Sequence, residues 1–174
     1  MIHVLVGDLA SQEAEGVVRP VRSDLSPLNA AARDLLLAAG GEVADRLEQL
    51  GSIPMGGAVM TPGGDLPAGF IIHVVTASDD EPETAHTVQR ALRNGLRRAA
   101  DWGLASLALP PLGLGVGNLA PEDAARAMVE ILVDHLDEGQ PPLDFTIVAS
   151  SAYEMEIFGH LVEELTRDRF PMRN

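Results

Sequence analysis

The chain contains no cysteine and no lysine, and aromatic residues make up 3% of its 174 residues. Without cysteine it forms neither a disulfide framework nor a thiolate zinc site. No run of about 18 apolar residues is present, so the sequence predicts no membrane span. The first residues, MIHVLV, lack the basic segment of a signal peptide and are typical of a strand, so the expected location is cytoplasmic.

Positive charge is also scarce: twelve arginines stand against 26 acidic residues, and the formal net charge is −14. A general DNA or RNA binder needs a basic face to displace counterions, so this balance argues against one. Hydrophobic residues at 46% and charged residues at 22% are typical of an ordinary globular protein. The length suits one domain over residues 1–174.

Short apolar segments alternate with helical patterns along the chain. Strands are predicted at 2–6, 16–18, 57–61, 70–75, 106–109 and 145–149, and helices at 26–39, 42–50, 84–103, 121–137 and 153–167. The first helix is expected to have Ser26 as its N-cap and Pro27 at its first position, and to stop at Gly40. This order predicts an α/β fold, a three-layer α/β/α sandwich with a mixed central sheet of about six strands and some antiparallel pairing between 57 and 75.

The most informative segment is LALPPLGLGVGNLAPE at residues 107–122, where an apolar strand runs into alternating glycines and then a helix start. Glycines allow a ligand to approach the backbone closely, and free N–H groups beside a helix N-terminus attract phosphate. The same residues also suit a tight strand-to-helix turn, so both interpretations stay open. Ligands of such sheets bind beyond the C-terminal strand ends, where Asp8, Arg22, this loop and Ser150 are expected.

Four patterns follow one another along nearly the whole chain: GDL at 7–9, GAVMTPG with LPA and IH within 57–73, LPPLGLGVG at 109–117, and AAR at 124–126. Together they resemble the macrodomains, the ADP-ribose-binding, Appr-1''-p processing-like family, of which this chain would be a divergent member. The first pattern resembles the family's Gly-Asp-Ile, and 109–117 looks like its phosphate loop. The resemblance implies a macrodomain-like sandwich that binds ADP-ribose or a related adenine nucleotide. No cofactor is expected, and the residues suggest no metal site.

The resemblance also implies roles for individual residues. Asp8 would accept a hydrogen bond from the adenine amino group, although it would also serve to cap the turn after the first strand. The Leu9 N–H would donate to the adenine ring, and the amides of 113–118 would hold the diphosphate and the second ribose. Ser150 stands where the family commonly stacks an aromatic ring on adenine, and Tyr153 is close enough to substitute. The implied ligand-binding residues are Asp8, Leu9, Arg22, Gly113, Leu114, Gly115, Val116, Gly117, Asn118, Ser150 and Tyr153.

Departures from the family pattern gather at the distal-ribose end. RPVR at 19–22 replaces the usual Asn-Ala-Ala-Asn, so Arg22 occupies the position of the key asparagine, and 28–30 (LNA) replaces the glycine triplet. Arg22 either pairs with a phosphate or balances nearby acids. Arg19 is interpreted as a surface arginine that balances acidic neighbours, among them Glu13, Glu15 and Asp24. His73, within an apolar strand, is interpreted as a core histidine with a hydrogen-bond partner.

Three functions remain open, and no catalytic residue is assigned. The first is a binding module for ADP-ribose or a related adenine nucleotide, with little or no turnover. The second is a hydrolase of ADP-ribosyl or O-acetyl-ADP-ribose linkages, in which Arg22 would polarise the substrate or Asn29 and Asn118 would position water. The third is a scaffold whose cleft is crowded by Pro20, Leu28 and Leu114 and which acts through protein contacts, with a homodimer as one option.

Overall fold

A six-stranded sheet forms the middle layer of the protein in the computed structural model, which describes residues 1–114, 119–167 and 169. The strand order is β1-β6-β5-β2-β4-β3, and the strands are Ile2–Val6 (β1), Gly16–Arg22 (β2), Ala58–Pro62 (β3), Phe70–Ala77 (β4), Ser106–Leu109 (β5) and Asp144–Ala149 (β6). Neighbouring strands are parallel except β3 and β4, which pair antiparallel. The predicted mixed sheet is confirmed, including the antiparallel pair.

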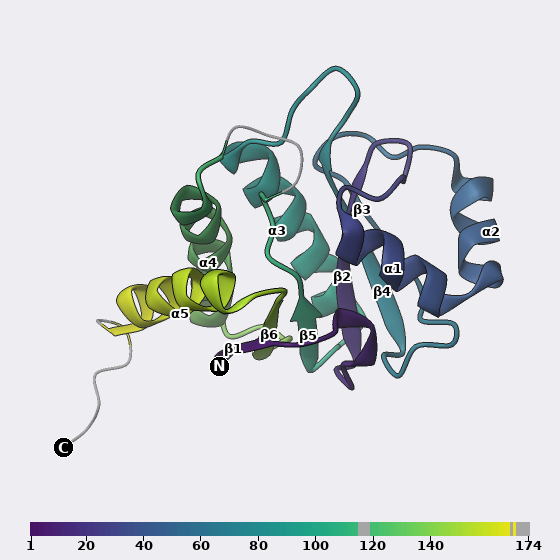
Figure 1. Cartoon of the computed structure of the whole chain (residues 1–174). Coiled ribbons are helices and arrows are strands. Elements are labelled where there is room, and N and C mark those ends of the chain that lie inside the picture. The colour runs from purple at the N-terminus through teal and green to yellow at the C-terminus, as the bar shows by residue number, and fades with distance from the viewer. Residues whose placement is uncertain (115–118, 168, 170–174) are drawn as a thin grey trace.

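Helices cover both faces of this sheet (Figure 1). Successive strand residues point to opposite faces, so Val17 and Val21 pack with α1 (Ala30–Ala39) and α2 (Gly41–Leu50). Val18 between them packs with α3 (Ala85–Asp101), α4 (Pro121–Glu138) and α5 (Ala152–Arg167). The predicted three-layer α/β/α arrangement is therefore confirmed, with an apolar core on each side of the sheet.

The start of α1 differs from the prediction. The Asn29 side chain accepts a hydrogen bond from the Ala32 N–H at 2.9 Å, so Asn29 is the N-cap and the helix begins at Ala30. The Ser26 hydroxyl and N–H donate to Asp24 instead. The prediction of a Ser26 N-cap followed by Pro27 in the helix is therefore wrong, whereas the predicted end at Gly40, which has a φ of 99°, is confirmed.

The second strand is longer than predicted, because β2 continues past Val18 to Arg22. Pro20 lacks an N–H and would normally interrupt a central strand. It is accommodated here because the pairing of β2 with β5 reaches only Val17, and the backbone of Pro20 faces that side. The proline therefore removes no bond from the ladder with β4.

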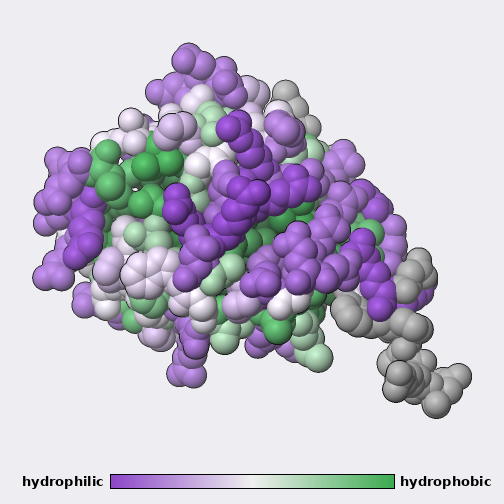
Figure 2. Space-filling model, turned by 180° about the vertical axis from the view of Figure 1, so that it is seen from behind, coloured by the Kyte–Doolittle hydropathy of each residue, from purple (hydrophilic) through white to green (hydrophobic). Residues whose placement is uncertain are grey.

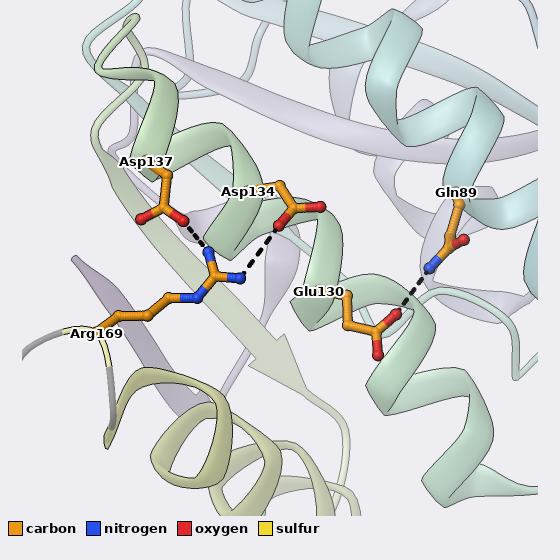
Figure 3. Close-up of polar contacts among 5 residues, drawn as sticks. All are labelled: Gln89, Glu130, Asp134, Asp137 and Arg169. Atoms are coloured by element: carbon orange, nitrogen blue, oxygen red, sulfur yellow. Dashed lines mark hydrogen bonds and ion pairs between the residues drawn. The ribbon is translucent and has the colours of Figure 1, made fainter.

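Polar contacts tie α4 to the elements beside it (Figure 3). Gln89 of α3 donates to Glu130 of α4 at 3.2 Å. Arg169, just beyond α5, pairs with Asp134 at 3.5 Å and also with Asp137. Asp134 and Asp137 are one helical turn apart, so one guanidinium reaches both carboxylates. These contacts join Gln89 and Arg169 to α4.

Hydrophilic side chains dominate the face shown in Figure 2, and hydrophobic side chains occupy smaller areas between them. This distribution fits a chain with 26 acidic and 12 basic residues. In the part of the chain that the structure describes, no helix combines the length and apolar character needed to cross a bilayer.

Candidate functional site

Four parallel strands end at one edge of the sheet. β1, β6, β5 and β2 are neighbours in that order and run in the same direction. Asp8 follows β1, Ser150 follows β6, Gly113 lies beyond the end of β5, and Arg22 ends β2. Ligands of open α/β sheets bind beyond such carboxyl ends. The four positions therefore share the edge at which a ligand would bind.

Asp8 caps the 3-10 helix η1 (Leu9–Ser11) at the end of β1. Its carboxylate accepts hydrogen bonds from the Ala10 N–H at 3.2 Å and from the Ser11 hydroxyl at 2.6 Å. An ionised carboxylate accepts about four hydrogen bonds, so the exposed Asp8 retains capacity for a ligand donor. The Leu9 side chain is 6% exposed and packs against the core beside α1, which leaves only its backbone for a ligand.

Gly113 begins the glycine-rich loop in a conformation that other residues rarely adopt. Its φ is +88°, and a Cβ placed on it would lie 2.9 Å from the Cβ of Ala124 in α4. The backbone at Gly113 therefore lies closer to the start of α4 than a residue with a side chain would allow. The other predicted loop residues, Gly115, Val116, Gly117 and Asn118, lie outside the described residues.

A pocket of about 310 Å³ lies between the loop after β5 and the start of α5. Tyr153 is 62% exposed, so its ring is open to a ligand there. The pocket brings together three residues predicted from the sequence, because its lining consists of Gly113, Leu114, Leu119, Pro121, Ser151, Tyr153 and Glu154.

Ser150 is turned toward Glu154. Its N–H and its hydroxyl both donate to the Glu154 carboxylate, at 3.0 and 2.8 Å, while the Glu154 N–H donates to the Ser151 hydroxyl at 3.2 Å. Glu154 and Ser151 line the pocket, and both were missed by the sequence analysis. The signal was available, since Ser-Ala-Tyr-Glu at 151–154 has the spacing of a capping box.

The end of the site formed by β2 is occupied by the chain itself. After β2 the backbone turns back, with the Arg22 N–H donating to the Ser26 carbonyl at 3.0 Å and the Leu28 N–H donating to the Pro20 carbonyl at 3.3 Å. β4 occupies the other side of β2, so this turn lies where β2 and β5 diverge. Leu28 is 6% exposed there, so its side chain is covered within this turn, and its crowding of a ligand cleft stays a prediction.

Arg22 contributes to the same turn. Its guanidinium donates to the Pro27 carbonyl at 3.2 Å, and the side chain is half-buried. Hydrogen bonds from Ser26, and next the positive charge of Arg22, lower the pKa of Asp24. The charge of Arg22 therefore acts on Asp24, whereas both interpretations of Arg22, pairing with a phosphate and balancing nearby acids, stay predictions.

Arg19 is not a surface residue, and that prediction is wrong. It is fully buried, because its position in β2 points it at α1 rather than at solvent. Its guanidinium donates to the Ala32 carbonyl at 2.9 Å and to the Leu25 carbonyl at 3.4 Å, while its Nη2 has no hydrogen-bond partner in the part of the chain described. Burial lowers the pKa of Arg19 to about 10, so it stays charged at neutral pH.

His73 is a buried histidine with hydrogen-bond partners, as predicted. It lies opposite Arg19 on β4, with its Nδ1 3.2 Å from the Arg19 guanidinium and its Nε2 2.9 Å from the Thr61 hydroxyl. Burial, and next the charge of Arg19, lower the pKa of His73 to about 3, so the ring is neutral. A guanidinium only donates, so Nδ1 must accept and the ring proton is assigned to Nε2, which donates to Thr61.

These groups define what the site offers chemically. The edge combines an acceptor for an amine at Asp8, an aromatic ring at Tyr153, and a close backbone approach at Gly113. Residues 1–114, 119–167 and 169 contain no cluster of three or more His, Asp or Glu side chains suited to a metal ion.

Sequence comparisons place this chain beside proteins of one family. The profile of the Macro domain family matches residues 18–128. An uncharacterized protein of Aeropyrum pernix is 36% identical over 129 residues, which cover 72% of this chain and 67% of that protein. A Klebsiella pneumoniae protein named O-acetyl-ADP-ribose deacetylase is 33% identical over 149 residues, covering 80% and 83%. An uncharacterized Mycobacterium tuberculosis protein is 31% identical over 134 residues, and this chain spans only 37% of its length.

Solved structures show the same fold. The Oceanobacillus iheyensis macrodomain with ADP has a TM-score of 0.84 at 21% identity, covering 95% of this chain and 91% of that one. A mutant of the same macrodomain with ADPR has a TM-score of 0.83 at 21% identity, and the match covers 94% of this chain and 92% of the mutant chain. The macro domain of ganglioside induced differentiation associated protein 2 has a TM-score of 0.82 at 20% identity, covering 99% and 86%.

Proposed function

The chain belongs to the Macro domain family, and we propose that it binds ADP-ribose or a related adenine nucleotide with little or no turnover. The observation that carries this proposal is the open half of the strand edge, where exposed Asp8 and the pocket between Gly113 and Tyr153 lie on neighbouring strands and loops. The solved macrodomain with ADP, which shares the fold, supports the same choice of ligand.

Asp8 and Tyr153 suit the adenosine end of such a ligand. The Asp8 carboxylate only accepts hydrogen bonds, so it is matched to the amino group of adenine. The exposed Tyr153 ring offers a stacking surface, a type of contact worth about 1–3 kcal/mol per base. Glu154 beside it carries a negative charge, which disfavours phosphate and suits the donor hydroxyls of a ribose.

The backbone from Gly113 onward suits the diphosphate. Amide N–H groups bind phosphate without adding a cation, which matters in a chain with a net charge of −14. Gly113 itself allows the close approach, because a side chain at that position would collide with Ala124. Residues 113–118 are the proposed diphosphate contacts.

Little or no turnover is proposed because the β2 end of the edge holds structural residues. Hydrolysis needs a group that positions or activates water. Arg22 only donates hydrogen bonds, and its guanidinium already contacts the Pro27 carbonyl. Leu28, which stands where the family's glycine triplet would expose bare backbone to the ligand, adds a buried apolar side chain at this end.

A second candidate function is deacetylation of O-acetyl-ADP-ribose, favoured by the Klebsiella pneumoniae relative of that name. Asn29 is the side chain to test, because its oxygen caps α1 and its amide nitrogen remains to orient water. Acetate release above that of a no-enzyme control, abolished in Asn29→Ser, would support this candidate. Serine keeps the helix cap and removes the amide, so the comparison separates stability from chemistry.

Isothermal titration with ADP-ribose, ADP and AMP tests the binding proposal. We expect Asp8→Ser to weaken ADP-ribose binding about tenfold or more, since a hydrogen bond to a charged group contributes about 1.5–3 kcal/mol. Serine keeps the cap of η1, and Asp34→Ser on α1 is the matched control for loss of one carboxylate. Absence of heat at high micromolar ligand would overturn nucleotide binding and leave the scaffold function.

A further inference from the structure

The strand β1 is an edge of the sheet, and among the described strands only β6 lies beside it. At one end of this parallel ladder the Phe145 N–H donates to the Met1 carbonyl, and at the other the Gly7 N–H donates to the Ala149 carbonyl. Backbone groups of successive strand residues alternate between the two sides of a strand. These two end contacts therefore fix which residues of β1 face β6 and which face outward.

Residues His3 and Leu5 direct their backbone N–H and C=O groups at β6. Ile2, Val4 and Val6 direct theirs at the open side, where no described residue pairs with them. The unpaired row is thus formed by three β-branched residues at alternate positions. Such a row is a template for pairing with another strand.

The opposite edge of the sheet is protected, and the contrast is informative. β3 ends at Pro62, and Arg46 and Arg98 line the surface beside it. Proline and charged side chains are the usual means by which proteins keep an edge from pairing. β1, with the sequence IHVLV, carries neither; its one titratable side chain, His3, pairs with Asp144 within the same molecule at 3.3 Å.

We propose that β1 pairs antiparallel with β1 of a second copy of this chain, about a two-fold axis at Val4. In that register Val4 faces the second copy's Val4, and Ile2 faces its Val6, so every outward N–H and C=O of the strand gains a partner. The facing side chains are all β-branched and apolar, which is the favourable type of cross-strand pair. The edge is its own complement in both backbone and side chains.

Apolar surface beside the strand extends the proposed contact. A specific interface buries about 800 Å² on each partner, more than a five-residue strand edge provides. Met1 is 71% exposed, and Leu143 and Val6 are each 48% exposed at this edge. A groove of about 910 Å³ adjoins Ile2, with Leu136 and Val162 in its wall. Pairing of two copies would bury this apolar surface, which is exposed to solvent in the monomer.

The net charge of the chain predicts how the association depends on salt. Two copies with a net charge of −14 repel one another, yet Ile2–Val6 contains no acidic residue. The charged groups beside it are the Met1 ammonium and, in the groove, Glu163 and Arg167, which carry opposite charges. Added salt screens the long-range repulsion. Association through β1 should therefore strengthen as salt rises, whereas association with a cationic partner would weaken.

Single cysteines test the register, because the chain has none of its own. Val4→Cys places the thiols on the two-fold axis with Cα atoms about 5.5 Å apart, within the range for a disulfide. Val6→Cys places the two thiols about four residues apart along the strand, or about 13 Å, and serves as the matched negative control. Mild oxidation should give a covalent dimer with Val4→Cys and not with Val6→Cys. Equal cross-linking of both, or of neither, would overturn the proposed register.

Sedimentation equilibrium of the full chain tests the association itself. The wild-type protein is expected at twice 18.4 kDa, with a dissociation constant that falls as salt is raised. Val6→Glu should shift the mass to that of the monomer, and Leu37→Glu on α1 should not, although Leu37 is also exposed and gains the same charge. A wild-type monomer at every concentration, or equal behaviour of the two variants, would overturn the proposal.

Discussion

Replacing Arg19 with alanine is expected to be among the most destabilising single changes in this protein. The side chain is fully buried and supplies hydrogen bonds to the carbonyls of Ala32 and Leu25 and to the ring of His73. These partners belong to the start of α1, the turn before it and the neighbouring strand. Truncation removes the donor for all three and leaves a cavity between the sheet and α1.

The expected loss of unfolding free energy for Arg19→Ala is about 3–5 kcal/mol. Leaving a buried acceptor without a donor costs about 1–3 kcal/mol, and a core cavity adds to it. One opposing effect reduces the loss, because the charged guanidinium is itself expensive to bury, as its lowered pKa of about 10 and its unpaired Nη2 indicate. Arg19→Met keeps most of the volume and removes the charge, so it should lose at least about 1 kcal/mol less than alanine.

Urea unfolding followed by circular dichroism measures these differences. Arg22→Ala is the matched control, because it removes the same side chain from a half-buried position with one carbonyl contact, and it should cost about 1 kcal/mol or less. The reasoning fails if Arg19→Ala costs no more than Arg22→Ala. It also fails if methionine is as damaging as alanine, since volume would then play no part.

Three further predictions concern the core, a cap and the loop. His73 has a pKa of about 3 in the folded protein, below its unfolded value of 6.5, so its contribution to stability is complete above about pH 6.5 and is lost as pH falls toward 3. Urea unfolding at pH 7 and at pH 5 should therefore show a loss of unfolding free energy of about 2 kcal/mol at the lower pH. His73→Gln should abolish this loss. Asn29→Ala should cost about 1 kcal/mol of unfolding free energy, and Asn29→Ser should restore it; equal values would show that the cap contributes nothing. Gly113→Ala should lower the unfolding free energy by about 1–3 kcal/mol, because the φ of +88° is strained for alanine and the new Cβ would collide with Ala124. Gly41→Ala should be neutral, because a Cβ at that position has no atom within 4 Å.

The local sequence pattern correctly predicted much of the fold, and particular residues show why. β5 was predicted with its observed ends because apolar residues there are bounded by Gly103 on one side and Pro110 on the other. Gly40 ended α1 because a positive φ suits glycine regardless of what surrounds it. The start of α1 was misplaced since Ser26 and Asn29 are both good caps. The Leu28 N–H bonds the Pro20 carbonyl and Pro27 forms a bridge with Val21, and these contacts keep residues 26–28 out of the helix.

The composition, the order of strands and helices and the glycine-rich loop were determined by the sequence alone, because spacing and residue type act over a few neighbours. The tertiary structure decided that Arg19 is buried, since its environment comes from α1 and β4 rather than from β2. It also decided that Glu154 and Tyr153 share a pocket with Gly113, because only the side-by-side parallel strands β5 and β6 bring those segments together. Contacts between residues distant in the chain depend on packing, which no local pattern encodes.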